Sequence, residues 1–279
     1  MNPFAKVPVI GAERDRELLK DAHSFIYAEP EGHKLLAHFY RPERIVGDAP
    51  VIAFFHGGLW EHGSATQFVP QCMHFAWREI IAVTFEYRTA AQHGATPEDA
   101  IQDIQTAILS LRQNSTHFGI LPDKIVAAGS GAGAYGALCA AMLPDVLMDG
   151  VYDARPDAVV AFSPIVNTTR RGIGTERFAD RAKAKAWSPS ENVRKGLPPT
   201  LLMHGLADRT SPFPLVKKFA KAMQRKQNEC DLVEFEGADH SFFNFNVSRT
   251  RYDLAMATAD KFLSDHGFID LAKGAEEIV

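Results

Sequence analysis

The sequence predicts an α/β fold in which helices cover both faces of a mostly parallel sheet. Three features of the 279-residue chain point to it. Short, near-continuous apolar runs alternate with helix-length segments, a hairpin-like stretch precedes them, and glycine or polar residues directly follow several runs. Strands that are apolar throughout are typical of a parallel sheet buried on both faces.

The composition is that of an ordinary globular protein. Hydrophobic residues make up 46% and charged residues 23% of the chain, which fits one domain over residues 1–279. The formal net charge of −4 gives no basic surface, so we expect no nucleic-acid partner. Three cysteines without a CxxC pair, Cys72, Cys139 and Cys230, predict buried thiols rather than disulfides or a metal site.

The N-terminal residues 1–23 lack the apolar core of a signal peptide. No apolar run reaches the length of a membrane span. We therefore expect a soluble protein with no membrane partner, cytoplasmic unless a leader has been removed.

The expected strands follow in chain order. After a polar N-terminal helix, residues 23–42 alternate as in a hairpin of two antiparallel strands. Six apolar runs then predict the remaining strands, beginning at Pro50, Ile80, Lys124, Ala158, Pro199 and Cys230.

Four long segments between or after these runs predict helices. The first begins at Thr96 with a threonine cap, a proline in the first turn and early acidic residues, followed by apolar residues three and four apart. The others begin at Gly131, Pro212 and Tyr252. Residues 167–196 are rich in charge and poor in apolar periodicity. We expect them to form a small lid over the crevice beyond the carboxyl ends of the strands, the alternative being a plain surface excursion.

The loop after the run at Pro50 reads HGGLW, residues 56–60. Glycines after a buried strand let the backbone approach a ligand and direct amide groups at a developing oxyanion. We expect such donors at Gly58, with Gly57 or Leu59 as further candidates, and a structural hydrogen-bonding role for His56.

The run at Lys124 ends in Gly129-Ser130-Gly131-Ala132-Gly133. A nucleophile elbow needs small residues two positions before and after the nucleophile, because its sharp turn brings strand and helix together. Gly129 and Gly133 meet this need around position 131. The pattern predicts an elbow whose central side chain is missing, with the Ala132 amide as an oxyanion donor.

The loops after the last two strand runs carry Asp208 and His240. The chain order of elbow, acid and histidine is that of α/β-hydrolases. In that arrangement Asp208 orients the imidazole of His240, which acts as the base. Taken singly, Asp208 could be a helix cap and His240 an ordinary loop histidine.

The chain resembles the acetyl-esterase-like branch of the α/β-hydrolases, near the hormone-sensitive-lipase and feruloyl/acetyl-xylan esterase groups. The resemblance runs from about Pro50 to Phe262 and rests on HGGLW, Tyr87-Arg88, DKIVAAG, LPPTLLMHGLAD and GADHSFFN. It implies an α/β-hydrolase fold, a small-molecule ester substrate, no cofactor and a Ser–Asp–His mechanism. It does not specify the acyl or alcohol group.

The chain departs from that family at the nucleophile, because the serine of G-x-S-x-G aligns with Gly131. Glycine has no hydroxyl, so no acyl-enzyme can form through this position. Ser130 has small neighbours in Ala128 and Ala132, but successive elbow side chains point in different directions, so it is the weaker candidate. For Ser163, at another strand end, we expect a structural role.

The predicted function is a carboxylic-ester hydrolase scaffold that is inactive or strongly impaired, whether the serine was lost naturally or removed by design. His240 acting as a base on water, a non-catalytic ligand-binding protein and an arylformamidase-like amide hydrolase remain alternatives. Edge strands could pair two subunits in a homodimer. Candidate pocket residues, for which core packing is an equal alternative, are Trp60, Ser130, Tyr135, Phe242 and Phe243.

Overall fold

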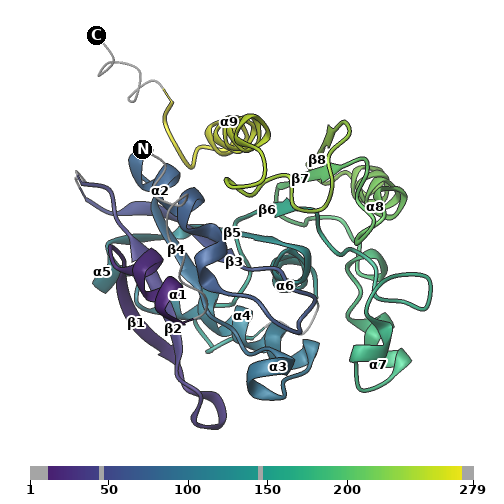
Figure 1. The fold of residues 1–279 in the computed structure, drawn as a ribbon, viewed down its shortest axis with the longest axis horizontal. Coiled ribbons are helices and arrows are strands. Elements are labelled where there is room, and N and C mark those ends of the chain that lie inside the picture. Colours follow the sequence, from purple (N-terminus) through teal and green to yellow (C-terminus); the bar gives the residue numbers. More distant parts are fainter. Residues whose placement is uncertain (1–11, 44–46, 144–146, 272–279) are drawn as a thin grey trace.

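The computed structural model describes residues 12–43, 47–143 and 147–271. Over these ranges the chain forms an eight-stranded sheet in the order β1-β2-β4-β3-β5-β6-β7-β8. Figure 1 shows the sheet crossing the molecule from β1 and β2 at one end to β8 at the other. The strands are β1 His23–Ala28, β2 Leu35–Tyr40, β3 Ala49–Phe55, β4 Ile81–Phe85, β5 Ile120–Ser130, β6 Ala158–Phe162, β7 Thr200–Gly205 and β8 Cys230–Phe235.

The sheet is mostly parallel, which confirms the predicted α/β-hydrolase fold. The pairs β1–β2 and β2–β4 are antiparallel, and every pairing from β4 through β3 and β5 to β8 is parallel. Strand β5 begins at Ile120, four residues before the predicted start, because Ile120 pairs with Ala49 ahead of a shift in register. The edge strands in the described ranges are β1 and β8; a dimer formed through either stays a prediction.

Both faces of the sheet are buried, and β3 shows why its run is apolar throughout. Val51 and Phe55 lie in a core cluster with α4 Pro97–Gln113, α6 Gly131–Met142 and α8 Phe213–Arg225. Their neighbours Ile52 and Phe54 lie in a second cluster, on the other face. That cluster contains α2 Val69–Trp77 and α9 Arg249–Asp265. Alternate side chains of one strand thus fill opposite cores, so polar residues have no place in it.

Helix starts follow local capping chemistry. The Asp99 amide donates to Thr96 Oγ1 at 3.3 Å while the Thr96 amide donates to the Asp99 carboxylate at 2.8 Å, and Pro97 follows the cap. This capping box confirms the start predicted at Thr96. Helix α9 begins three residues before the predicted Tyr252, because the Ser248 hydroxyl caps it by accepting the Arg251 amide.

Helix α2 is absent from the helices expected from the sequence. Pro70 in its first turn was the available start signal. The remaining short elements are α1 Ala12–Leu19, η1 Pro30–Gly32, η2 Ala65–Phe68, α3 Ala90–His93, α5 Ser115–Phe118, η3 Thr175–Arg177, α7 Arg181–Ala186 and η4 Pro189–Glu191.

Residues 167–196 connect β6 to β7 and include η3, α7 and η4. The Phe178 ring packs edge-on against Trp60, with ring centroids 6.0 Å apart, and Arg177 pairs with Glu61 at 2.6 Å. The segment therefore contacts the HGGLW loop. Its role as a lid stays a prediction.

A buried ion pair joins the segment after β4 to α4. The Arg88 guanidinium donates to the Asp103 carboxylate at 2.9 Å, and both side chains are about 5% exposed or less. The Asp103 hydrogen bond raises the pKa of Arg88 above its usual value. The cost of burying these two charges is offset only while both are present.

Asp103→Asn is expected to destabilise the fold by about 3 kcal/mol, because it removes the one buried carboxylate beside the buried Arg88 charge and leaves only the more exposed Glu31 and Asp99, at 3.5 and 3.7 Å. Urea unfolding followed by circular dichroism measures the change. The matched control is Asp265→Asn, which removes a carboxylate from the exposed Lys261–Asp265 pair and should leave stability nearly unchanged. Equal effects of the two substitutions would contradict this assignment.

Candidate active site

The four loops that carry the predicted site residues follow β3, β5, β7 and β8. These strands are parallel, so their carboxyl ends lie along one edge of the sheet. Ligand crevices in such sheets form at this edge. The structure brings Gly131, Asp208 and His240 together there.

His240 and Asp208 form a hydrogen-bonded pair. His240 Nδ1 donates to Asp208 Oδ2 at 2.8 Å, and the second carboxylate oxygen accepts the amides of Thr210 and Ser211 at 2.8 and 2.9 Å. The Asp208 side chain is fully buried, whereas that of His240 is 26% exposed. The histidine thus connects a buried carboxylate to a solvent-accessible position.

The environment of Asp208 keeps it ionised. Burial alone would raise the pKa of Asp208, but hydrogen bonds from His204, His240 and the Ser211 amide outweigh it and hold this pKa below its usual range. An ionised Asp208 accepts hydrogen bonds only, so Nδ1 of His240 carries the proton. In the neutral ring, Nε2 is then left with a lone pair.

Gly131 lies opposite that lone pair. It follows Ser130, the last residue of β5, and opens α6 with φ of +49°, in the left-handed region. A Cβ placed on Gly131 would lie 3.3 Å from His240 Nε2 and 3.7 Å from Cε1. Apart from its own chain neighbours and helix turn, no other heavy atom of the described residues comes within 4 Å of this position.

The two flanking glycines are required by close backbone contacts. A Cβ on Gly129 would lie 2.6 Å from the Phe55 carbonyl oxygen, and one on Gly133 would overlap the same oxygen. Strand β3 therefore approaches the junction of β5 and α6 too closely for any side chain at either position. This is the steric need from which the sequence predicts an elbow centred on residue 131.

The HGGLW loop turns sharply beside the elbow. Gly58 has φ of +118°, and Leu59 and Trp60 adopt φ of +55° and +60°. The Gly57 amide donates to Gln67 Oε1 at 2.7 Å, so it is already engaged. In the described ranges, no acceptor is found for the amides of Gly58, Leu59 and Ala132. These three stay candidate oxyanion donors.

Gln67, which the sequence analysis missed, links three loops. Its Oε1 also accepts the Ser130 hydroxyl at 3.1 Å, and its Nε2 donates to Asn244 Oδ1 at 3.4 Å. The Ser130 hydroxyl is thereby directed toward Gln67. Ser163 is buried directly after β6, with φ of +43° and no acceptor for its hydroxyl among the described residues.

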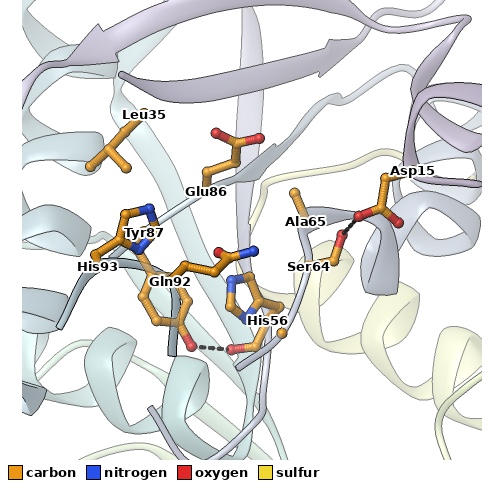
Figure 2. A pocket seen from close by; sticks show the side chains of 10 residues that line it. Asp15, Leu35, His56, Ser64, Ala65, Glu86, Tyr87, Gln92 and His93 are labelled. Carbon is orange, nitrogen blue, oxygen red and sulfur yellow. Dashed lines mark hydrogen bonds between the residues drawn. The ribbon is translucent and has the colours of Figure 1, made fainter. Parts of the chain in front are cut away.

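His56 is buried and neutral. Its Nδ1 donates to the Gly57 carbonyl at 2.8 Å, its ring stacks on Tyr87, and the Tyr87 hydroxyl donates to the His56 carbonyl at 2.7 Å (Figure 2). Burial lowers the pKa of His56 to about 4. A base of such low pKa is poorly matched to neutral pH, and these contacts fit a structural role.

The candidate aromatic pocket residues all lie in the core. Trp60 and Tyr135 pack against each other on one face of the sheet, and Phe242 and Phe243 pack on the opposite face. All four are at most 2% exposed. None of them lines the cavity of about 420 Å³ beside His56, shown in Figure 2. Their placement favours the core-packing alternative.

Neither a cluster of metal ligands nor a membrane-spanning helix is found in the described part of the chain. No three His, Cys, Asp or Glu side chains there are grouped as metal ligands would be. No helix in the same ranges is long and apolar enough to cross a membrane.

Solved structures similar to this chain include several of one esterase from the Planctomycetes species Thermogutta terrifontis. A Thermogutta terrifontis esterase, Est2, in its propionate-bound form is 35% identical, with 90% of this chain and 96% of that chain covered and a TM-score of 0.85. The same enzyme phosphorylated by paraoxon is 36% identical, with 90% and 96% covered and a TM-score of 0.83.

Curated relatives are more distant and longer. Esterase LipC of Mycobacterium tuberculosis is 27% identical, over 89% of this chain and 66% of its own length. The probable isoprenylcysteine alpha-carbonyl methylesterase ICMEL1 of Arabidopsis thaliana is 24% identical, over 78% and 50%. The chain thus spans between half and two thirds of the length of these relatives.

The BD-FAE family matches residues 38–223, which is more than half of the chain and includes the HGGLW loop and the elbow. Together with the Est2 likeness, this match shows that the chain belongs to the BD-FAE family of α/β-hydrolase esterases.

Proposed function

We propose that the chain is a carboxylic-ester hydrolase scaffold for small esters in which Gly131 occupies the nucleophile position, so that turnover is absent or strongly impaired. The observation that carries this proposal is the 3.3 Å between a Cβ at Gly131 and His240 Nε2. A hydroxyl on that Cβ would lie within hydrogen-bonding reach of Nε2, as a serine nucleophile must.

The remaining residues keep the roles of a serine-esterase site. His240 is the base that takes the nucleophile's proton and returns it to the leaving group, and Asp208 orients the ring and stabilises its protonated form. The amides of Gly58, Leu59 and Ala132 are the proposed oxyanion donors. Since the Gly57 amide is bound to Gln67, we assign it to positioning the loop.

A short acyl chain is the proposed substrate class. Est2 is described with propionate and with butyrate bound, and it is similar to this chain over nine tenths of its length. Residues 167–196 are proposed to cover the crevice, because Phe178 packs against Trp60 of the HGGLW loop and Arg177 pairs with the adjacent Glu61. The same glycine supports a second candidate, a protein that binds an ester at this site without turning it over.

Gly131→Ser is expected to create hydrolysis of 4-nitrophenyl acetate and butyrate, with kcat on the order of 10³-fold or more above that of the unaltered chain. The reason is that serine supplies the covalent step that glycine cannot. Release of 4-nitrophenol measures ester hydrolysis, and release of 4-nitroaniline from 4-nitroacetanilide measures amide hydrolysis.

The control for this experiment is Gly131→Ser/His240→Ala, which keeps the new serine but removes its base and should lose the gain. Circular dichroism checks that each variant folds, since residue 131 has a left-handed φ. A folded Gly131→Ser protein that stays silent on all three substrates contradicts the hydrolase assignment and favours the binding protein.

Gln67→Leu, introduced into the Gly131→Ser protein, is expected to lower kcat by about tenfold with little change in KM, because three loops lose a shared hydrogen-bonding partner. Gln67→Glu keeps an acceptor for the Gly57 amide and should restore part of the rate. The matched control, Gln92→Leu, removes an exposed glutamine and should change neither constant. An unchanged kcat in Gln67→Leu would contradict a positioning role.

A further inference from the structure

We propose that the cavity beside His56 is a binding site for a small organic cation that carries a primary ammonium group. The cavity, shown in Figure 2, has a volume of about 420 Å³, which lies within the range of small-molecule sites, roughly 300–1,000 Å³. None of Gly131, Asp208 and His240 lines it, so binding there is separate from the proposed ester chemistry.

Two carboxylates from different elements line the cavity. Asp15 lies on α1, and its two oxygens accept the hydroxyls of Ser64 and Thr66 at 2.9 and 3.2 Å. Glu86 follows β4, and its Oε2 accepts the Leu36 amide at 3.2 Å. No lysine or arginine in the described ranges pairs with either carboxylate. The lining therefore carries negative charge, which attracts a ligand of opposite charge.

His56 adds a hydrogen-bond acceptor to the same lining. The residue is 3% exposed, and its Nδ1 donates to the Gly57 carbonyl at 2.8 Å. Burial lowers the pKa of His56 to about 4, although the charges of Glu86 and Asp15 act on the ring in the opposite direction. The ring is thus neutral at neutral pH, and Nε2 carries a lone pair. No partner for Nε2 is found among the described residues, so this buried acceptor indicates a donor in the cavity.

The chemistry of the lining selects the ligand. Carboxylate oxygens and a neutral imidazole nitrogen all accept hydrogen bonds, and a primary ammonium is a cation with three N–H donors. His93, also in the lining, adds no opposing charge at neutral pH, because burial and the neighbouring His33 lower its pKa. No three His, Cys, Asp or Glu side chains of the described residues are grouped as metal ligands, which favours an organic cation over a metal ion.

The cavity also offers a surface for a short carbon chain. Leu35 and Tyr87 line it and are at most 2% exposed, and the Tyr87 ring stacks on His56 with centroids 4.1 Å apart. An alkyl chain can pack on these side chains while the ammonium meets the carboxylates. Since His56 directly precedes Gly57, a ligand bound to Nε2 also contacts the start of the HGGLW loop.

The experiment titrates the unaltered chain with n-butylammonium chloride at constant ionic strength and follows the NMR shift of His56 Nε2. We expect a saturable change, because this nitrogen gains a donor, together with shifts of the Gly57 and Gly58 amides. Tetramethylammonium is the matched probe, since it contains the same atoms and the same charge but no N–H group. It should bind more weakly by about tenfold or more.

Two variants test the carboxylates. Glu86→Gln and Asp15→Asn each remove one negative charge while keeping an oxygen acceptor, and each should weaken n-butylammonium binding by about tenfold. The matched control is Glu17→Gln, which removes a charge from the same helix as Asp15 but outside the cavity. It should change the affinity by less than about twofold, because an exposed charge is screened by salt. Circular dichroism checks that each variant folds.

A shift that rises without saturation would overturn the inference, as would equal affinity for the two cations or undiminished binding by either folded variant. Calcium chloride that saturates the same shift at a lower concentration than n-butylammonium would overturn the assignment to an organic ammonium. The titration uses the unaltered chain and no ester, so its outcome is independent of whether Gly131→Ser hydrolyses esters.

Discussion

The hydrogen bond between Asp208 and His240 is the interaction on which the candidate site depends. It joins two loops from adjacent parallel strands and fixes which ring nitrogen carries the proton. The buried carboxylate is satisfied by the ring and by two backbone amides, so its charge is stable without solvent. With Nδ1 held in this way, Nε2 lies 3.3 Å from the position of a Cβ on Gly131, at the start of α6.

In the proposed function, the glycine at residue 131 is a local change in a site whose other parts are kept. Gly129 and Gly133 still allow β3, β5 and α6 to meet at distances that no side chain permits. Gln67 still connects the HGGLW loop with the elbow and with Asn244. We therefore interpret the chain as an esterase scaffold that keeps its base and its oxyanion donors without a nucleophile of its own. Under this proposal the site can hold an ester without forming an acyl-enzyme.

The fold and the pair Asp208–His240 could be predicted because each has a local signature: apolar runs for strands, glycine spacing for the elbow, and chain order for acid and base. The Gln67 contacts could not, because they join residues 10, 63 and 177 positions apart with no repeated spacing. Helix α2 was missed because its proline start signal follows a loop of irregular turns. The sequence alone could not show whether the aromatic residues near strand ends line a pocket or pack in the core. In the structure they are buried and pack in the core.

The most direct test of the central claim, that residue 131 occupies the nucleophile position beside His240, is labelling with paraoxon followed by peptide mass spectrometry. An organophosphate reacts with a serine that is activated by a neighbouring base. The account predicts a phosphoryl adduct at residue 131 in the Gly131→Ser protein and none in the unaltered chain. An adduct on Ser130, in either protein, would contradict it and show that the elbow presents the preceding residue to the base.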